Sequence, residues 1–219
     1  MRDTSPDTAA LLAHSSFEVT PRSYARYVAS GGQIPPGSTV FVAHIAGTGF
    51  DEVLSTACDL RRNGANPVPH LPARLFSTHN QLQDCLTAYR DQADVRRVLL
   101  IAGGVRQAAG SFQSSMDLVE TGLFDRLGFQ ALSFAGHPEG SRDIDPRGGT
   151  VNVDAALRWK YAFAQRSDIA PSLVTQFVFD AAPVITWAER IRAAGITLPI
   201  HVGLAGPASL KDLIRHGVD

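Results

Sequence analysis

The sequence predicts an α/β protein built as a (β/α)8 barrel of the TIM type, and three observations lead there. Seven short apolar runs alternate with longer amphipathic segments, which is typical of parallel strands joined by crossover helices. Residues with catalytic chemistry stand near the carboxyl ends of several runs, where barrel enzymes place their active sites. No glycine-rich dinucleotide motif follows the first run, and this disfavours an open doubly wound sheet.

The predicted strands are short apolar runs that end at polar residues, glycine or proline. In chain order they span residues 16–20, 39–45, 67–71, 98–102, 131–135, 173–179 and 200–204.

Three intervening segments have helical periodicity and recognisable ends. The first stops at Gly64 and the third at Gly195, and glycine suits the position just after a helix. The second repeats apolar residues at i, i+3, i+4 and i+7, with Ser77 or Thr78 placed to cap it. These helices are predicted over residues 50–64, 77–90 and 182–195.

We expect a single domain over residues 1–219 that lacks the eighth strand of the barrel. The chain stops at Asp219, just after a helix predicted from "PASLKDLIRHG", whereas such barrels usually run to about 250 residues. We therefore expect the chain to be incomplete at its carboxyl end; the alternative is a seven-stranded barrel with an open edge. The polar, Gly- and Pro-rich segment 140–150 is predicted as a loop on the active-site face.

The composition favours a cytoplasmic protein that binds neither nucleic acid nor a membrane. The formal net charge is −1, and no Lys/Arg-rich run offsets it locally. The amino terminus lacks the pattern of a signal peptide, and no apolar run approaches the roughly 20 residues that span a bilayer. No HxH, HExxH or CxxC spacing occurs, so no metal site is expected.

Two polar residues in the first and third predicted strands are candidates for chemistry. Glu18 stands among apolar neighbours in "SSFEVTP", where desolvation would disfavour its charged form, as suits a general acid. The alternative is a structural carboxylate paired with Arg22 or Arg74. His70 lies between two prolines in "NPVPHLPAR", and a lone histidine of this kind is more often structural.

Further polar residues and a glycine pair stand near the ends of other strands. Gly103 and Gly104 let the backbone approach a ligand, although a simple turn explains them equally well. We expect His201 to be packed or hydrogen-bonded rather than catalytic. The remaining residues are His44, His137 and Glu139.

Gln176 interrupts the sixth apolar run, "SLVTQFVFD", where an aliphatic residue is expected. On the inner wall of a barrel its amide must hydrogen-bond, because an unpaired buried amide costs on the order of 1–3 kcal/mol. Its paired donor and acceptor suit a heterocycle with adjacent N–H and C=O groups.

Several segments in the same order resemble the methylenetetrahydrofolate reductase family, closest to a bacterial reductase-like branch. They are "FEVTP", "PHLPAR", "AGHPEG", "VTQFVFD" and "GITLPIHVGLAGP", which together cover the chain from Phe17 onward. The resemblance implies a flavin-containing (β/α)8 barrel that reduces 5,10-methylenetetrahydrofolate to 5-methyltetrahydrofolate. In that family NADH or NADPH passes hydride to FAD, and the reduced flavin passes it to the folate.

The resemblance also implies roles for individual residues. Glu18 matches the general acid that protonates a folate nitrogen and opens the bridging ring to an iminium. Gln176 matches a glutamine that contacts the pterin. The cofactor-binding positions are His70 and His137 beside the flavin, Lys160 near its phosphates and Asp154 near its ribose.

The chain departs from the family after the fourth and seventh strands. Many members carry an Arg-Gly-Asp-like turn after strand four, where this chain has Ala102 and Gly104 in place of arginine and aspartate. Leu210 replaces an aromatic residue found in many members. A flavin-independent reductase, a non-redox folate-binding or methyl-transfer barrel, and a chain that folds poorly remain as alternatives. A homo-oligomer is a further expectation.

Overall fold

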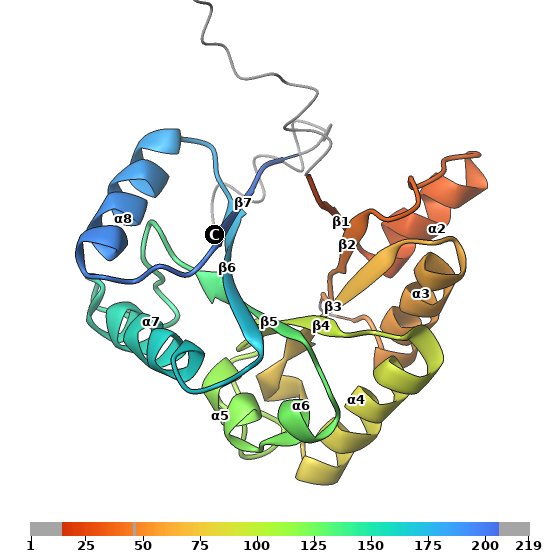
Figure 1. The fold of residues 1–219 in the computed structure, drawn as a ribbon, viewed down its shortest axis with the longest axis horizontal. Helices are drawn as coiled ribbons and strands as arrows, with labels where there is room; N and C mark the ends of the chain where they lie inside the picture. The colour runs from red at the N-terminus through yellow and green to blue at the C-terminus, as the bar shows by residue number, and fades with distance from the viewer. Residues whose placement is uncertain (1–14, 46, 206–219) are drawn as a thin grey trace, which may run out of the picture.

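The fold is an alternation of strands and helices in which every strand runs in the same direction (Figure 1). A computed structural model describes residues 15–45 and 47–205. The strands are β1 (Phe17–Val19), β2 (Thr39–Val42), β3 (Asn66–Pro72), β4 (Arg97–Ile101), β5 (Ala131–Gly136), β6 (Ala170–Phe177) and β7 (Ile200–Gly203). They form one seven-stranded parallel sheet in the order β1-β2-β3-β4-β5-β6-β7.

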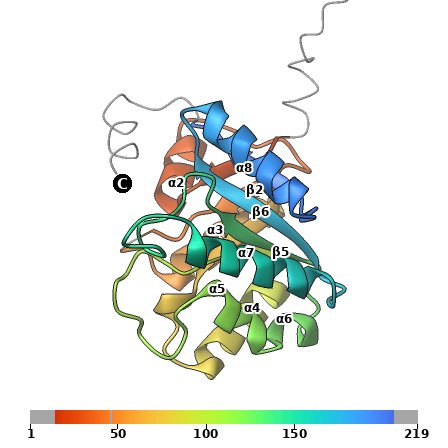
Figure 2. The ribbon, with the colours of Figure 1, turned by 90° about the vertical axis from the view of Figure 1, so that its left-hand side faces the viewer.

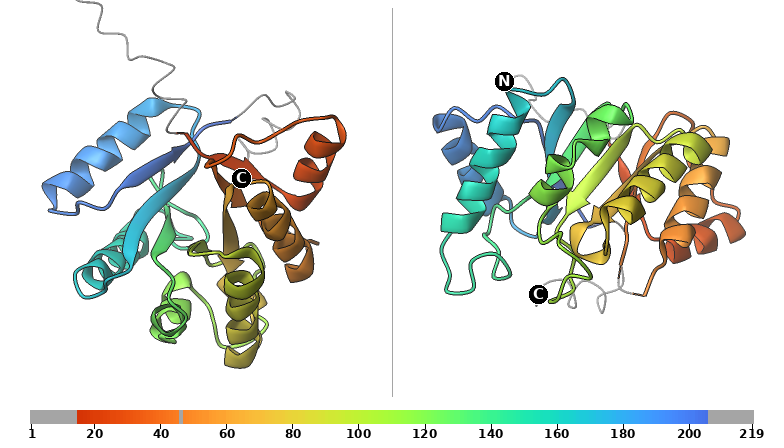
Figure 3. Two further views of the ribbon diagram at one scale, coloured as in Figure 1. Left: turned by 45° about the vertical axis from the view of Figure 1, so that its right-hand side comes forward. Right: turned by 90° about the horizontal axis from the view of Figure 1, so that it is seen from below.

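The sheet is curled, and the helices lie along its outer side (Figures 1 and 3). They are α2 (Pro21–Ala29), α3 (Phe50–Arg62), the 3-10 turn η1 (Ala73–Leu75), α4 (His79–Ala93), α5 (Ser115–Glu120), α6 (Leu123–Arg126), α7 (Val151–Ala164) and α8 (Ala181–Ala193). Among the described helices, none is long and apolar enough to cross a membrane.

The predicted α/β class with a parallel sheet is confirmed, whereas closure as an eight-stranded barrel is not. β1 and β7 are the two edges of the described sheet, and they do not pair with each other. The sheet is therefore a curled half-barrel covered by helices on its convex side, with α7 and α8 over the β5–β6 side (Figure 2).

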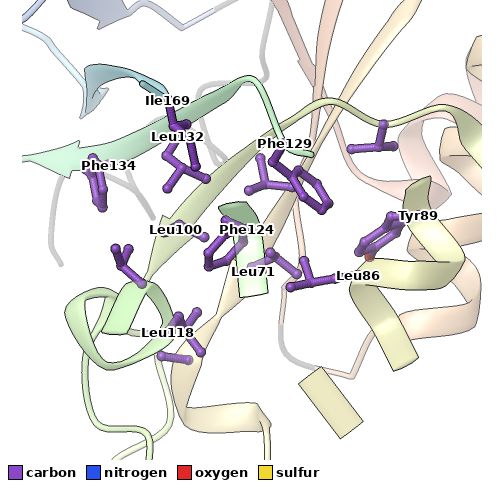
Figure 4. Packing of buried hydrophobic residues seen from close by; sticks show 14 of the residues in the cluster. Leu71, Leu86, Tyr89, Leu100, Leu118, Phe124, Phe129, Leu132, Phe134 and Ile169 are labelled. Carbon is purple, nitrogen blue, oxygen red and sulfur yellow. The ribbon is translucent and has the colours of Figure 1, made fainter. Parts of the chain in front are cut away.

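Two hydrophobic clusters lie on the two faces of the sheet. The large one fills the space between sheet and helices and includes Leu71, Leu100, Leu132 and Tyr89 (Figure 4). Val40 and Val42 of β2 belong to this large cluster. Because side chains alternate along a strand, Phe41 between them points to the opposite face of the sheet. Phe41, Val68 and Leu99 accordingly form the second cluster, inside the curl.

The predicted cap of α4 and the glycines predicted after α3 and α8 are confirmed, whereas α4 runs to Ala93, beyond its predicted end at residue 90. Thr78, not Ser77, caps α4, because its side chain accepts a hydrogen bond from the Gln81 amide. Gly64 and Gly195 both adopt the positive φ angles that glycine tolerates best, +82° and +81°. The helix boundaries could be read locally because capping depends on a few adjacent residues.

The sixth strand was predicted over residues 173–179 but runs earlier, from Ala170 to Phe177. Its start is extended because Ala170 pairs with Ala131 of β5. Its end coincides with the last register pair to β7, between Phe177 and Gly203. Asp180 then caps α8 by accepting a hydrogen bond from the Ala182 amide. The second strand also ends early, at Val42.

The predicted loop 140–150 joins β5 to α7. Its buried residue Asp145 accepts hydrogen bonds from the backbone amides of Asn152 and Val153, at 3.1 and 3.0 Å. This carboxylate satisfies amides of the first turn of α7 and ties the loop to the helix.

Candidate functional site

An open pocket of about 450 Å³ lies at the carboxyl ends of the strands, inside the curl of the sheet. All seven strands, or the residues that directly follow them, contribute to its wall. Its apolar lining includes Phe41, Leu99, Ile101 and Val174, which belong to or pack on the inner cluster. Its polar lining consists of Ser16, Glu18, His44, His70, Thr175, Gln176 and His201.

Glu18 and His70 meet in this pocket, although the sequence separates them by 52 positions. The Oε2 atom of Glu18 lies 3.6 Å from Nε2 of His70. The Glu18 side chain is 46% exposed, whereas that of His70 is 10% exposed. The expected burial of Glu18 is therefore wrong, because β1 is an edge strand of the described sheet and leaves this carboxylate open to the pocket.

The imidazole of His70 is neutral near pH 7. Burial, and secondarily the nearby His44, lower the pKa of His70 from its usual 6.5 to about 4. Its contact with Glu18 is thus not an ion pair at neutral pH. Nε2 is buried and forms no hydrogen bond within the described part of the chain, since 3.6 Å is too long for one.

Gln176 lies in the same pocket but is exposed, so its predicted burial is also wrong. The pairing of β6 with β7 is irregular between Val174 and Phe177. At this irregularity Thr175 Oγ1 donates to the Gln176 carbonyl at 2.8 Å and accepts from the Gly203 amide at 2.9 Å. The Gln176 side-chain amide therefore faces an open pocket, where a ligand can reach it.

Lys160 and His137 lie outside the lining of this pocket. The buried Nζ of Lys160 donates to the carbonyl of Ala135 at 2.8 Å and lies 5.8 Å from the centre of the Phe134 ring, on the outer face of β5. Burial lowers the pKa of Lys160 to about 8. Burial, followed by the positive charge of Lys160, lowers the pKa of His137 to about 4.

Asp154 links two helices and also lies outside the pocket. Its Oδ2 accepts hydrogen bonds from Arg190 of α8 and from Thr150, at 2.8 and 2.9 Å. Burial alone would raise the pKa of Asp154, but these hydrogen bonds and the charges of Arg190 and Arg158 outweigh it and lower the pKa.

The turn after β4 is held by Arg74. Its guanidinium donates to the carbonyls of Gly103 and Val105, and it forms an ion pair with Asp143 at 3.1 Å. Arg74 therefore ties the turn to the β5–α7 loop. Its carboxylate partner is Asp143 and not Glu18, which was the alternative considered for Glu18. Leu210 lies outside the described residues.

Two histidines of the pocket carried little signal in the sequence. His201 is exposed and lines the pocket, so the expectation that it is packed is wrong. His44 is 8% exposed, and its Nε2 lies 2.9 Å from the carbonyl of Thr48. Because a carbonyl can only accept, that nitrogen carries the proton. Their shared position at strand ends was the signal available.

The described lining of the pocket contains no lysine or arginine. Burial is the main reason that the pKa values of His44, His70 and His201 are lowered, so these side chains are neutral near pH 7. The described lining combines an apolar floor, neutral donors and acceptors and the carboxyl group of Glu18, which together fit a flat heterocycle such as a pterin or the ring of a flavin. It does not fit the pyrophosphate of FAD, which needs cationic or amide donors.

The fold and the pocket define a class: parallel α/β proteins with an open pocket at the carboxyl ends of their strands. No protein-family model matches the chain. Within residues 15–45 and 47–205, no group of three His, Cys, Asp or Glu side chains is placed to hold a metal ion.

Proposed function

We propose that this protein is a folate-linked oxidoreductase that reduces 5,10-methylenetetrahydrofolate to 5-methyltetrahydrofolate with NADH or NADPH. We propose further that its curled sheet is a (β/α)8 barrel without the eighth strand. The observation that carries the proposal is that Glu18 of β1 and Gln176 of β6 line one pocket with an apolar floor. These are the two residues that the resemblance assigns to acid catalysis and pterin binding.

In the proposed reaction Glu18 donates a proton to a nitrogen of the bridging ring. The bond between that nitrogen and the methylene carbon breaks, and the other nitrogen forms an iminium with this carbon. Hydride from the reduced nicotinamide adds to the methylene carbon and gives the methyl group and the oxidised nucleotide. A carboxyl group that is half exposed in the pocket can be protonated again from solvent.

His70 is well placed to orient the acid. A neutral imidazole that carries its proton on Nε2 donates to Glu18 Oε2 once the 3.6 Å separation closes by about half an ångström, and catalytic hydrogen bonds often tighten on substrate binding. The other carboxyl oxygen then holds the transferable proton and faces the substrate. His70 is therefore a positioning residue in this proposal.

Gln176 supplies recognition of the pterin. Its amide offers donors and an acceptor to the adjacent N–H and C=O groups of that ring. The Thr175 and Gly203 hydrogen bonds hold the backbone beneath it, so the amide needs little reorganisation on binding.

The same pocket favours a second candidate, a barrel that binds folate without redox chemistry. The observation behind it is the described lining without lysine or arginine, together with the small residues Ala102 and Gly104 after β4, where the family has charged anchors. A dissociable nicotinamide nucleotide needs to place only its ring in the pocket, so the same observation also supports reduction without a bound flavin.

The test compares Glu18→Gln with Glu139→Gln, a carboxamide substitution on an exposed residue outside the pocket lining. We expect Glu18→Gln to lower methyl-folate formation by a factor on the order of 100 or more, since general acids contribute that much. Binding of 5-methyltetrahydrofolate, measured by calorimetry, should stay within a factor of about two. Unchanged turnover in Glu18→Gln would exclude the acid role, and folate binding without nucleotide oxidation in the wild type would favour the second candidate.

The absorbance spectrum of the purified protein separates the two routes of reduction. A bound-flavin spectrum, bleached by NADH and restored by methylene-folate, would show that FAD is held in spite of the neutral lining. A colourless protein that still oxidises NADH with methylene-folate would establish direct use of the nicotinamide.

A further inference from the structure

A second pocket, of about 430 Å³, lies at the opposite end of the sheet. It is formed where β2, β3, β4 and β5 begin, around Thr39, Asn66, Arg97 and Ala131. The inner cluster of Phe41, Val68 and Leu99 stands between the two pockets, since Val68 lines the second, and Phe41 and Leu99 line the first. Nothing in the proposed reaction uses this second pocket.

Three arginines line this amino-end pocket, against one carboxylate, Asp94. Arg96 is paired with Asp94 at 2.8 Å. Arg61 donates to the carbonyls of Ala93 and Asp94 and to the Asn66 side chain, at distances between 2.9 and 3.1 Å. These acceptors hold the Arg61 guanidinium rigidly but do not neutralise it, so the described lining carries an excess of two positive charges.

Arg97 is the guanidinium available to a ligand. It is the first residue of β4 and lies on the same face of that strand as Leu99, two positions later, so it belongs to the inner side of the curl. Arg97 is exposed, and its side chain forms no hydrogen bond or ion pair with any described residue. The amide of Gln130 and the hydroxyl of Thr39, from the neighbouring parts of the wall, offer further donors.

We propose that the amino-end pocket binds an oxyanion ligand, a phosphate ester or a polycarboxylate, with Arg97 as its principal contact. The planar guanidinium fork matches both groups in a bidentate manner. Arg61, whose charge is not neutralised by its acceptors, adds a positive potential that attracts the anion, and the concave wall concentrates it. The pocket volume, about 430 Å³, accommodates a ligand larger than phosphate itself.

The two pockets are electrostatically coupled through His201. Burial, and after it the charge of Arg97, lowers the pKa of His201, which lines the carboxyl-end pocket together with Glu18, His44 and His70. An anion on Arg97 cancels that charge. The pKa of His201 then moves back toward its ordinary value, so the titration of His201 reports whether an anion occupies the amino-end pocket.

The test titrates the full chain with inorganic phosphate and, separately, with citrate, at constant ionic strength and with chloride as reference. The variants are Arg97→Gln and Arg126→Gln, which removes the same charge from an exposed position on α6 outside the pocket. We expect saturable binding to the wild type and to Arg126→Gln, and affinity about tenfold lower in Arg97→Gln, the order expected for a charge-assisted contact. Tighter binding of phosphate than citrate would identify the phosphate-ester class, and the reverse order the polycarboxylate class.

Two outcomes would overturn the proposal. One is that the wild type shows no saturable binding of either anion up to roughly 50 mM. This limit is well above the Kd of a weak specific site. The other is equal affinity of Arg97→Gln and Arg126→Gln. NMR titration of the His201 ring gives a second readout that needs no enzymatic activity: its pKa should rise in Arg97→Gln and in the anion-saturated wild type, and stay unchanged in Arg126→Gln.

Discussion

The two ends of the sheet hold pockets of similar volume, about 450 and 430 Å³, with opposite electrostatic character. The carboxyl-end pocket has an apolar floor, neutral imidazoles and the carboxylate of Glu18. The amino-end pocket has three arginines and one aspartate. A single sheet thus separates a pocket suited to an uncharged ring from one suited to an anion.

The difference between the two pockets can be followed along one strand. β4 places Arg97 at one end and Leu99 and Ile101 along the inner face toward the other. The charge of Arg97 also contributes, after burial, to the lowered pKa of His201 in the carboxyl-end pocket.

The largest expected effect is a loss of folding free energy in acid, which arises because His70 is buried in its neutral form. Its folded pKa of about 4 lies below the ordinary 6.5, so its contribution is complete above pH 6.5 and is lost as the pH falls through 4. The loss corresponds to about 3 kcal/mol. Denaturant unfolding of the wild type and of His70→Phe at several pH values measures it.

The variant His70→Phe should be less sensitive to acid than the wild type by that amount. His79→Phe, which alters an exposed histidine on α4, should keep the wild-type pH dependence. Parallel curves for the wild type and His70→Phe would mean that His70 is not buried as a neutral group, and the carboxyl-end pocket would lose its neutral character.

The next effect tests the backbone support of the carboxyl-end pocket. A Cβ atom on Gly203 would lie 2.8 Å from the Gln176 carbonyl oxygen and 3.0 Å from that of Thr175. Gly203→Ala should therefore push β7 from β6 and lower the free energy of unfolding by about 2 kcal/mol. Gly104→Ala is the control, because nothing lies within 4 Å of its added Cβ. Equal thermal midpoints for the two variants would contradict the described packing of β7.

A smaller effect is expected on ligand affinity at Gln176. Gln176→Leu keeps most of the side-chain volume and removes the amide, so binding of 5-methyltetrahydrofolate should weaken about tenfold. Gln165→Leu, at the exposed end of α7, should bind as the wild type does. Calorimetry measures both, and identical affinities would remove Gln176 from the site.

The smallest expected effect is a difference between the two pockets in how strongly salt weakens ligand binding. Phosphate affinity at the amino-end pocket should fall about threefold between about 0.1 and 0.5 M NaCl, because salt screens exposed charges. Binding of the uncharged 6-methylpterin to the carboxyl-end pocket should change less. A similar salt dependence for both ligands would contradict the proposed electrostatic difference between the two pockets.

Much of the fold followed from the sequence because it depends on local patterns. The alternation of strands and helices, the Thr78 cap and the terminal Gly64 and Gly195 all depend on periodicity or on a few adjacent residues. Strand ends were less predictable. The end of β6 coincides with the end of its pairing with β7, and its start with its pairing to β5, and both partner strands are remote in sequence.

The candidate site divides in the same way. Glu18, His70 and Gln176 were identified from unusual residues at strand ends, and the fold brings all three to one pocket. Lys160 and Asp154 were assigned by resemblance through a variable loop, and His137 was noted just after the fifth strand and given its role by resemblance. The fold places all three outside the pocket lining.

The sequence by itself determined that this is a parallel α/β protein, because hydrophobic periodicity and helix caps are encoded over a few residues. Tertiary structure decided which polar groups are buried and which are open. Glu18 is exposed because its strand is an edge, His70 is buried because its strand is internal, and three arginines meet because four strands begin together. Burial and charge clustering are sums over residues distant in the chain, so no local pattern contains them.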